Sequence, residues 1–435
     1  MRIAFAFWPT SAHLNPLVPL AWAFKVAGHD VVFTSHPSAG GDVSRAGLPF
    51  VPACTVEEMP APAGPGSEWT QAREVVASVT DRLGVPEGYD LEWQTVSQGF
   101  LPSMWDFTSF SGDAATPLPA IDGMVAFFRA WKPDLVIWDP CMPGAAVAAR
   151  AVGAMQIRQC GTDQFGWYQD TFEQRTQELG VDGSLPNPFV ETVRGPAERH
   201  GVDIDRDLLY GDWTLSHVPD ELNLPVHTSR IPMAWVPYVA QEPMPAWLHA
   251  PRDRPRVALS LGTSLRQYVQ DLDWSYLQGA LDALRSLDVE VVATLDELQC
   301  SQLDLDPRSV RVVDFLPLDQ LVPTCDLLIH HGGLGTSVTA SVAGVPQLVL
   351  DYLADDGDRY KLAPIVGDYV AGWRAGGVLD LSGASSDDLA VRIDDVLRSQ
   401  EARQGAEELR ASVAERPMPS DVVGTLERLV MGRIA

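Results

Sequence analysis

The chain has 435 residues, 46% of them hydrophobic and 20% charged, a balance typical of a folded globular protein that is too long for one ordinary core. Its formal net charge of −27, from 31 Lys and Arg against 58 Asp and Glu, argues against a broad basic surface for nucleic acid or an anionic membrane. We therefore expect no nucleic-acid partner. No apolar run approaches the roughly 20 residues that a membrane helix needs, so we expect no membrane insertion either.

The first half of the chain alternates strand and helix patterns. Arg2–Phe7 is an apolar run suited to a buried parallel strand, and Trp8–Leu14 is predicted as a loop. Asn15 is typical of a helix N-cap, with Pro16 at the first helical position. That helix should end at Gly28. The elements predicted after it are the strand Val31–Thr34, the helix Ile121–Trp131, the strand Asp134–Trp138 and the helix Ala145–Val152.

A second series with the same alternation begins after Pro251. Its predicted strands are Arg256–Leu261, Val289–Thr294, Val310–Phe315, Asp326–His330 and Pro346–Leu350, and its predicted helices are Leu272–Leu287, Thr336–Ala343 and Asp387–Ser399. Two such series predict two doubly wound α/β domains. Because ligands bind beyond the carboxyl ends of strands in such sheets, we expect two domains facing an interdomain cleft.

The strand Asp326–His330 runs through a glycine-rich turn, Gly332–Thr336, into a helix. Glycines allow close backbone approach to an anion, and a helix N-terminus offers free N–H groups and partial positive charge. An ordinary strand-to-helix turn is the alternative, but the two histidines that enter it, His330 and His331, favour anion binding. Neither half carries a well-placed Gly-x-Gly-x-x-Gly or Walker loop, which disfavours a dehydrogenase or a kinase.

His13 follows the first strand and Asp139 follows the strand Asp134–Trp138, so both should lie at the carboxyl edge of one sheet. A histidine can act as a general base near neutral pH, and a carboxylate can fix its tautomer and stabilise the imidazolium. The residues alone also allow a solvated histidine and an aspartate that caps the turn before Pro140. The acidic string Asp304–Asp306 is interpreted as a solvated turn rather than a metal site.

Over nearly its whole length the chain resembles the GT-B, family 1 glycosyltransferases. The resemblance rests on "VVDFLPLDQLVPTCDLLIHHGGLGTSVTASVAGVPQLVL" (Val312–Leu350), "SAHLNPLVPLAWAFKVAGHDVVF" (Ser11–Phe33) and "MAWVPYVAQEPMPAWL" (Met233–Leu248). The last two are similar to the deoxysugar transferases of macrolide and other polyketide antibiotic pathways. The resemblance implies an inverting transfer of a deoxysugar from a TDP-sugar to a natural-product aglycone. The TDP-sugar would be a co-substrate, with neither a metal nor a cofactor required.

The same resemblance implies roles for individual residues. His13 would be the general base and Asp139 its partner. The residues implied for the nucleotide diphosphate are Thr263, Ser264, His331, Gly332, Gly333, Gly335 and Thr336, and those whose backbone would receive the base are Phe315 and Leu316. Thr263 and Ser264 could instead cap the segment that follows them.

Family members commonly end the signature with Asp-Gln, whereas Asp355 is followed here by Asp356. This departure disfavours an ordinary glucose donor and favours a deoxysugar. We hypothesise that the extra carboxylate accepts the ammonium of an amino sugar, and a solvated acidic loop is the alternative.

The acceptor side is expected to be apolar. Met59–Trp69 is rich in Pro, Gly and Ala, and aromatic residues follow it at Trp93, Phe100, Trp105, Phe107 and Phe110. Such a segment suits a large, flat or macrocyclic acceptor, although the same aromatics could form core. An auxiliary protein resembling a cytochrome P450, or a second copy in a homodimer, is a candidate partner.

The resemblance divides the chain into an acceptor-binding domain (1–230), a linker (231–250), a nucleotide-sugar-binding domain (251–415) and a C-terminal helix (416–435) that packs back on the first domain. The five cysteines are scattered without a Cys-x-x-Cys, and the apolar run Ile3–Trp8 is too short for a signal peptide and lacks a small-residue cleavage site, so a cytoplasmic location is expected. Two alternatives to a transferase are a nucleotide-sugar epimerase of the same fold and a non-catalytic partner that binds nucleotide sugar or polyketide.

Overall fold

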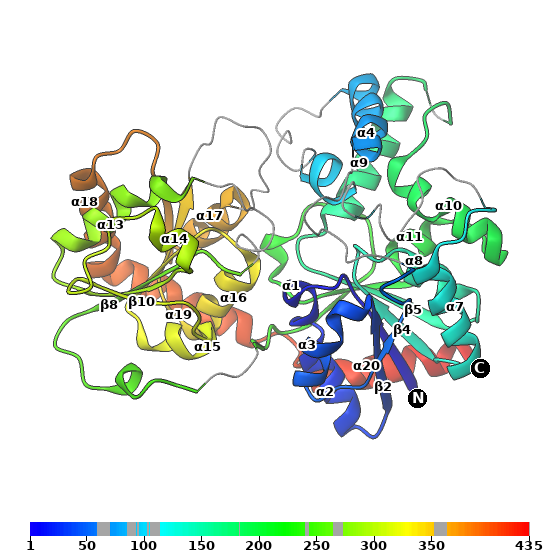
Figure 1. Ribbon diagram of the computed structural model, residues 1–435, viewed down its shortest axis with the longest axis horizontal. Helices are drawn as coiled ribbons and strands as arrows, with labels where there is room; N and C mark the ends of the chain where they lie inside the picture. The colour runs from blue at the N-terminus through cyan, green and yellow to red at the C-terminus, as the bar shows by residue number, and fades with distance from the viewer. Residues whose placement is uncertain are drawn as a thin grey trace. The chain divides into compact units, whose positions relative to one another are not determined.

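The computed structural model describes residues 1–58, 70–84, 93, 95–101, 104, 114–181, 183–239, 243–263, 273–351 and 363–434. These residues form two compact units, which Figure 1 shows as ribbons. Unit 1 contains the described residues of Met1–Met233 and Pro417–Ala435. Unit 2 contains those of Ala234–Gly357 and Lys361–Arg416.

Unit 1 is built on a seven-stranded parallel sheet in the order β3-β2-β1-β4-β5-β6-β7. All residues of β4 and β5 are buried, as expected for parallel strands covered on both faces. The strands are β1 (Arg2–Ala6), β2 (Asp30–Ser35), β3 (Phe50–Pro52), β4 (Leu135–Trp138), β5 (Met155–Cys160), β6 (Trp213–Ser216) and β7 (Arg230–Pro232).

Helices connect these strands and cover the sheet (Figure 1). They are α1 (Ser11–Leu14), α2 (Val18–Val26), α3 (Gly40–Arg45), α4 (Thr70–Leu83), α7 (Pro119–Trp131), α8 (Gly144–Arg150), α9 (Gln164–Glu178), α10 (Pro188–His200), α11 (Arg206–Tyr210) and α20 (Pro419–Ile434). The last of them, α20, packs against α2 of unit 1 and carries Arg433, which forms an ion pair with Asp212 at 2.7 Å. The end of the chain therefore completes the unit that its beginning forms.

The predicted start of the first helix is wrong. Asn15 ends the short helix α1, with its backbone N–H donating to Ser11 O, and α2 begins only at Val18, with Leu17 at its N-cap and Pro19 in its first turn. The segment predicted as a loop thus contains one helical turn, which carries His13. A proline does lie in the first turn of this helix, but it is Pro19 rather than Pro16.

Unit 2 is built on a six-stranded parallel sheet in the order β10-β9-β8-β11-β12-β13. The strands are β8 (Arg256–Ser260), β9 (Glu290–Thr294), β10 (Val310–Val313), β11 (Leu327–His330), β12 (Gln347–Asp351) and β13 (Gly376–Asp380). The helices are α13 (Gln278–Ser286), α14 (Glu297–Ser301), α15 (Leu318–Leu321), α16 (Leu334–Ala343), α17 (Ala363–Gly372), α18 (Ser386–Arg398) and α19 (Gln400–Ala414).

One hydrophobic core of unit 2 lies between the sheet and the helices α13 and α18. Strand residues such as Leu259 and Ile329 pack there with Leu281 and Ile393, all of them almost fully buried. The helix predicted over Leu272–Leu287 is divided in the structure. A 3₁₀ turn at Trp274–Leu277, capped by the Asp273 side chain, precedes α13.

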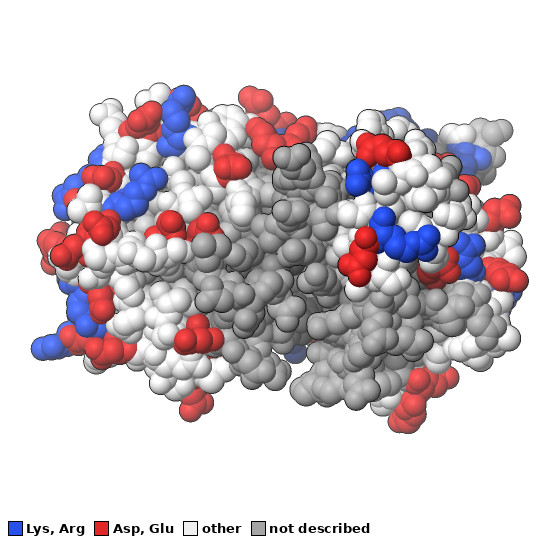
Figure 2. Space-filling model, turned by 90° about the horizontal axis from the view of Figure 1, so that it is seen from above, with Lys and Arg blue, Asp and Glu red and all other residues white. Residues whose placement is uncertain are grey.

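Two parallel sheets with helical connections confirm the predicted doubly wound α/β class. Within the described part of the chain, no helix has the length and apolar character to cross a membrane. The face drawn in Figure 2 carries Asp and Glu spread widely, with Lys and Arg among them. Several arginines are held in local ion pairs, such as Arg194 with Glu191 and Arg398 with Asp394. Any phosphate is therefore expected to be held by local donors.

Candidate functional site

Unit 1 brings His13 and Asp139 into contact. Strands β1 and β4 are parallel neighbours with Ala6 opposite Trp138, so the residues that follow them meet at one edge of the sheet. The Nδ1 atom of His13 lies 2.5 Å from Oδ2 of Asp139. Because Nδ1 is engaged by the carboxylate, Nε2 is the ring nitrogen available to accept a proton.

The Asp139 carboxylate is buried and accepts two backbone hydrogen bonds as well. The Trp8 N–H donates to Oδ2 at 3.1 Å, and the Cys141 N–H donates to Oδ1 at 2.9 Å. Burial would raise the pKa of Asp139, but the nearby His13 and these hydrogen bonds outweigh it and hold the pKa below its ordinary value. The partner of His13 is therefore a carboxylate at neutral pH.

The segment after α1 is tied to the sheet by a residue that the sequence did not single out. Gln159, in β5, donates from Nε2 to Pro16 O at 2.9 Å. Its neighbour Arg158 is fully buried and contacts Asp163 at 2.5 Å, and Asp163 caps α9. These polar residues break the apolar pattern of β5, which is why that strand was not predicted.

In unit 2, the loops after β8 and β11 lie side by side because these strands are parallel neighbours with His330 opposite Ser260. The glycine-rich turn follows β11 directly and leads into α16, whose N-cap is Gly333. Ser337 is the first helix residue whose N–H donates to the preceding turn, at 3.0 Å from Gly333 O. Among the described residues, the N–H groups of the first turn, which carries no acidic residue, have no intrahelical acceptor and can therefore serve an external one.

The imidazole of His331 fits between the backbones of two glycines. A Cβ atom added to Gly262 would lie 2.5 Å from His331 Cε1, and one added to Gly333 would lie 2.5 Å from His331 Nε2. Gly332 has φ +88° and packs so closely on α17 that its Cβ would lie 2.7 Å from the Ala363 Cα. The glycines thus hold His331 and the start of α16 together at the sheet edge.

The two histidines of the turn differ. His330 is fully buried, with Nε2 3.1 Å from Gln347 Oε1 and Nδ1 accepting from the Gly332 N–H at 3.2 Å. Burial lowers the pKa of His330 to about 3, and it also lowers that of His331 to about 4, with a smaller opposing effect of the Ser260 backbone. Both rings are therefore neutral at neutral pH. His330 supports the turn, and His331 is the partly exposed one.

Other predicted residues of unit 2 lie at the same edge of the sheet. Thr263 is exposed in the loop after β8, and Thr336 is buried in the first turn of α16. After β10, Phe315 is 39% exposed and Leu316 is buried. Ser264, Asp355 and Asp356 lie outside the described residues.

The predicted aromatic segment is described only in part. Trp93 is fully buried against Tyr168, with ring centroids 4.5 Å apart, and Phe100 packs on Phe165 at 5.1 Å. For Trp93 the core interpretation therefore holds. Met59–Trp69, Trp105, Phe107 and Phe110 lie outside the described residues.

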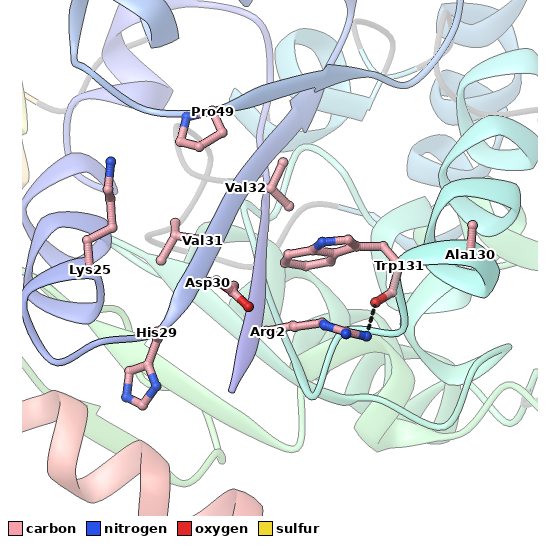
Figure 3. A pocket seen from close by; sticks show the side chains of 9 residues that line it. All are labelled: Arg2, Lys25, His29, Asp30, Val31, Val32, Pro49, Ala130 and Trp131. Carbon is pink, nitrogen blue, oxygen red and sulfur yellow. Dashed lines mark hydrogen bonds between the residues drawn. The ribbon is translucent and has the colours of Figure 1, made fainter.

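A cavity of about 580 Å³ opens at the opposite edge of the unit 1 sheet (Figure 3). It is lined by residues at the amino ends of β1 and β2, among them Arg2 and Asp30, and by Trp131, whose carbonyl accepts from Arg2. It is therefore separate from the edge that carries His13 and Asp139.

Comparison with known proteins assigns the family. The N-terminal domain model of the erythromycin biosynthesis protein CIII-like family matches residues 22–262, and its C-terminal domain model matches residues 278–429. The chain is 34% identical to the aclacinomycin-T 2-deoxy-L-fucose transferase of Streptomyces galilaeus, over 99% of this chain and 96% of the relative. It is also 34% identical to the TDP-daunosamine transferase DnrS of Streptomyces peucetius, over 99% of this chain and 97% of the relative.

Solved structures agree with this assignment. The spinosyn forosaminyltransferase SpnP superposes with a TM-score of 0.77 at 28% identity and covers 99% of both chains. The glycosyltransferase VinC, solved in complex with DTDP, gives the same TM-score at 30% identity, over 99% of this chain and all of VinC. The predicted resemblance is confirmed: the chain belongs to the erythromycin biosynthesis protein CIII-like family and is a glycosyltransferase of the GT-B fold.

Proposed function

We propose that this glycosyltransferase moves a deoxysugar from a TDP-sugar to a hydroxyl group of a polyketide or similar aglycone, with inversion at the anomeric carbon. The observation that carries the proposal is the contact of 2.5 Å between His13 and the buried Asp139 carboxylate. The relatives named above support the donor and acceptor classes.

His13 is the proposed general base. The acceptor hydroxyl gives its proton to Nε2 as its oxygen attacks the anomeric carbon, and the positive charge that develops on the ring is stabilised by Asp139. Asp139 accepts hydrogen bonds from two backbone N–H groups and is ionised at neutral pH, so it suits this role. Asp139 acts through His13 and is therefore a positioning residue.

The turn before α16 is the proposed diphosphate site. As the sugar–oxygen bond breaks, negative charge grows on the leaving diphosphate. The N–H groups of the first turn of α16, the Thr336 hydroxyl and a neutral His331 would donate to it. Thr263 and Ser264 are proposed as further donors, and the Phe315–Leu316 backbone as the contact for the base. Because these donors would stabilise the negative charge on the leaving diphosphate, we propose that no metal is needed.

The identity of the donor sugar is a finer proposal, which depends on Asp355 and Asp356. If Asp356 accepts an ammonium group, TDP-amino-deoxysugars will bind more tightly than neutral TDP-deoxysugars, and Asp356→Asn will remove the difference. Equal affinities that Asp356→Asn leaves unchanged would contradict this assignment.

For the protein partner, an auxiliary protein resembling a cytochrome P450 and a second copy of this chain are both proposed. We propose a cytoplasmic location, which the five free cysteines support.

The test is a mass-spectrometric screen of the purified protein with a panel of TDP-deoxysugars and polyketide aglycones. We expect a product whose mass equals the aglycone plus the sugar residue, formed equally well after treatment with EDTA, and NMR should show the anomeric configuration inverted. A changed nucleotide sugar formed without acceptor would favour an epimerase. Tight TDP-sugar binding without product across the panel would favour a non-catalytic partner.

A further inference from the structure

A third side chain with metal-binding chemistry lies beside His13 and Asp139. One ring nitrogen of His13, one carboxylate oxygen of Asp139 and Sγ of Cys141 all lie within 4.8 Å of one another. Cys141 follows Asp139 by two residues, and its backbone N–H donates to Oδ1 of that carboxylate at 2.9 Å. This turn sets the Cys141 side chain next to the His13–Asp139 pair.

Nitrogen, oxygen and sulfur donors of this kind suit a zinc ion. Zinc binds His, Asp and Cys with bond lengths of about 2.0–2.3 Å, so donors around one tetrahedral ion lie about 3–4 Å apart. The three donor atoms lie within 4.8 Å of one another, and the 2.5 Å between His13 Nδ1 and Asp139 Oδ2 would have to widen as the ion binds. Mg²⁺ and Ca²⁺ instead prefer six or more oxygen ligands, which this cluster does not supply.

The three side chains differ in burial. Cys141 and Asp139 are 4% and 5% exposed, whereas the His13 side chain is 24% exposed. Of the three proposed ligands, His13 is therefore the one most accessible to solvent. Two ligands are then fixed by the turn after β4, and the third comes from the single helical turn α1.

We propose that His13, Asp139 and Cys141 form a zinc-binding site that inhibits the enzyme. Binding breaks the Cys141 S–H bond, releases that proton to solvent and forms a Zn–S bond. Asp139 and Nδ1 of His13 each donate a lone pair, and the proton that Nδ1 shares with Asp139 moves to Nε2. A ring protonated on Nε2 cannot accept the acceptor's proton, so zinc and catalysis exclude each other. The inhibition rests on the proposed role of His13, whereas the binding of zinc does not.

Cobalt(II) provides a direct test of binding, because a thiolate ligand gives Co²⁺ a charge-transfer absorption band. The full-length chain should bind one Co²⁺ with this band, and Zn²⁺ should displace it. The band should be lost in both Cys141→Ala and Cys141→Ser, and it should be retained in the control Cys54→Ala, which removes another buried thiol of unit 1. Absence of the band in the wild-type protein, or its persistence in a folded Cys141→Ala variant, would overturn the proposal.

Inhibition is measured separately, as turnover against free Zn²⁺. The wild-type enzyme should lose activity reversibly, with recovery on chelation, and Mg²⁺ should have no such effect. Cys141→Ala should need about tenfold or more Zn²⁺ for the same fractional loss, each variant being compared with its own metal-free rate. Equal sensitivity of the two proteins would mean that zinc acts elsewhere, for example on the donor diphosphate, and would overturn the inhibitory role. Failure of the proposed transfer reaction would leave the cobalt result standing.

Discussion

Replacing Asp139 by Asn keeps the size of the side chain and removes its charge. The carboxylate accepts three hydrogen bonds, from His13 Nδ1 and Trp8 N on Oδ2 and from Cys141 N on Oδ1. An amide has only one acceptor oxygen, so its NH₂ group must face a donor on one side. Facing Cys141, it leaves a buried N–H unsatisfied, at a cost of about 1–3 kcal/mol. Facing His13, it removes the acceptor of the Trp8 N–H and requires Nδ1 to accept, which places the ring proton on Nε2.

Either arrangement removes the negative charge that stabilises the imidazolium, and one of them also blocks the base. We expect Asp139→Asn to lower kcat by about 10³- to 10⁴-fold, as found when a histidine base loses its carboxylate in a catalytic triad. That fall corresponds to about 4–5 kcal/mol of activation free energy. The affinity for TDP should not change, because the proposed diphosphate donors belong to unit 2.

The assay measures initial rates of glycoside formation by mass spectrometry, together with TDP binding by calorimetry. The matched control is Asp134→Asn, which removes the same charge at the other end of β4, where Asp134 accepts from the Arg2 N–H at 2.7 Å. A folded Asp139→Asn enzyme within about tenfold of the wild-type kcat would refute the assignment of Asp139.

Three further predictions concern the turn before α16 and the metal requirement. Gly332→Ala should lower the melting temperature more than Gly28→Ala does, and it should weaken TDP binding. The two glycines have φ of +88° and +86°, but only at Gly332 would the new Cβ meet another residue, Ala363. Equal shifts in melting temperature would contradict the close packing. The free energy of unfolding should fall by about 1.4 kcal/mol per pH unit between pH 6 and 4 because of His330, since the unfolded ring takes up a proton that the buried ring, with its pKa of about 3, does not. Urea unfolding of His330→Gln should show a correspondingly flatter pH dependence, and an unchanged slope would rule this cause out. EDTA should leave turnover unaffected, and an activity that is lost with EDTA and regained with Mg²⁺ would show that a metal is needed.

The elements that could be predicted from the sequence are those whose local pattern matches their final environment. Strands β1, β4 and β8 are short, mainly apolar runs because both faces of a parallel sheet are covered. Strand β5 has the sequence MQIRQC and was not predicted, although it is buried throughout. Its polar side chains find partners in the folded unit: Gln156 accepts from Trp138 Nε1 at 2.7 Å, and Arg158 contacts Asp163. Such pairing exists only once the chain has folded.

In the candidate site, too, contacts that form only in the folded chain could not be predicted from the sequence. His13 and Asp139 could be placed together because each follows a strand, and the two strands are neighbours in a doubly wound sheet. The position of His331 between Gly262 and Gly333 depends on the pairing of β8 with β11, and no spacing within either segment encodes it. The sequence gives no sign that Cys141 lies near His13, because their closeness depends on the turn after β4.

The central claim, that His13 is the general base of a glycosyl transfer, is tested most directly by His13→Gln. Glutamine retains a polar side chain but cannot accept the proton. With the donor and aglycone identified by the screen, we predict that kcat falls by at least about 10²-fold while calorimetry gives an unchanged affinity for TDP. Turnover at the wild-type rate in the folded variant would contradict the account.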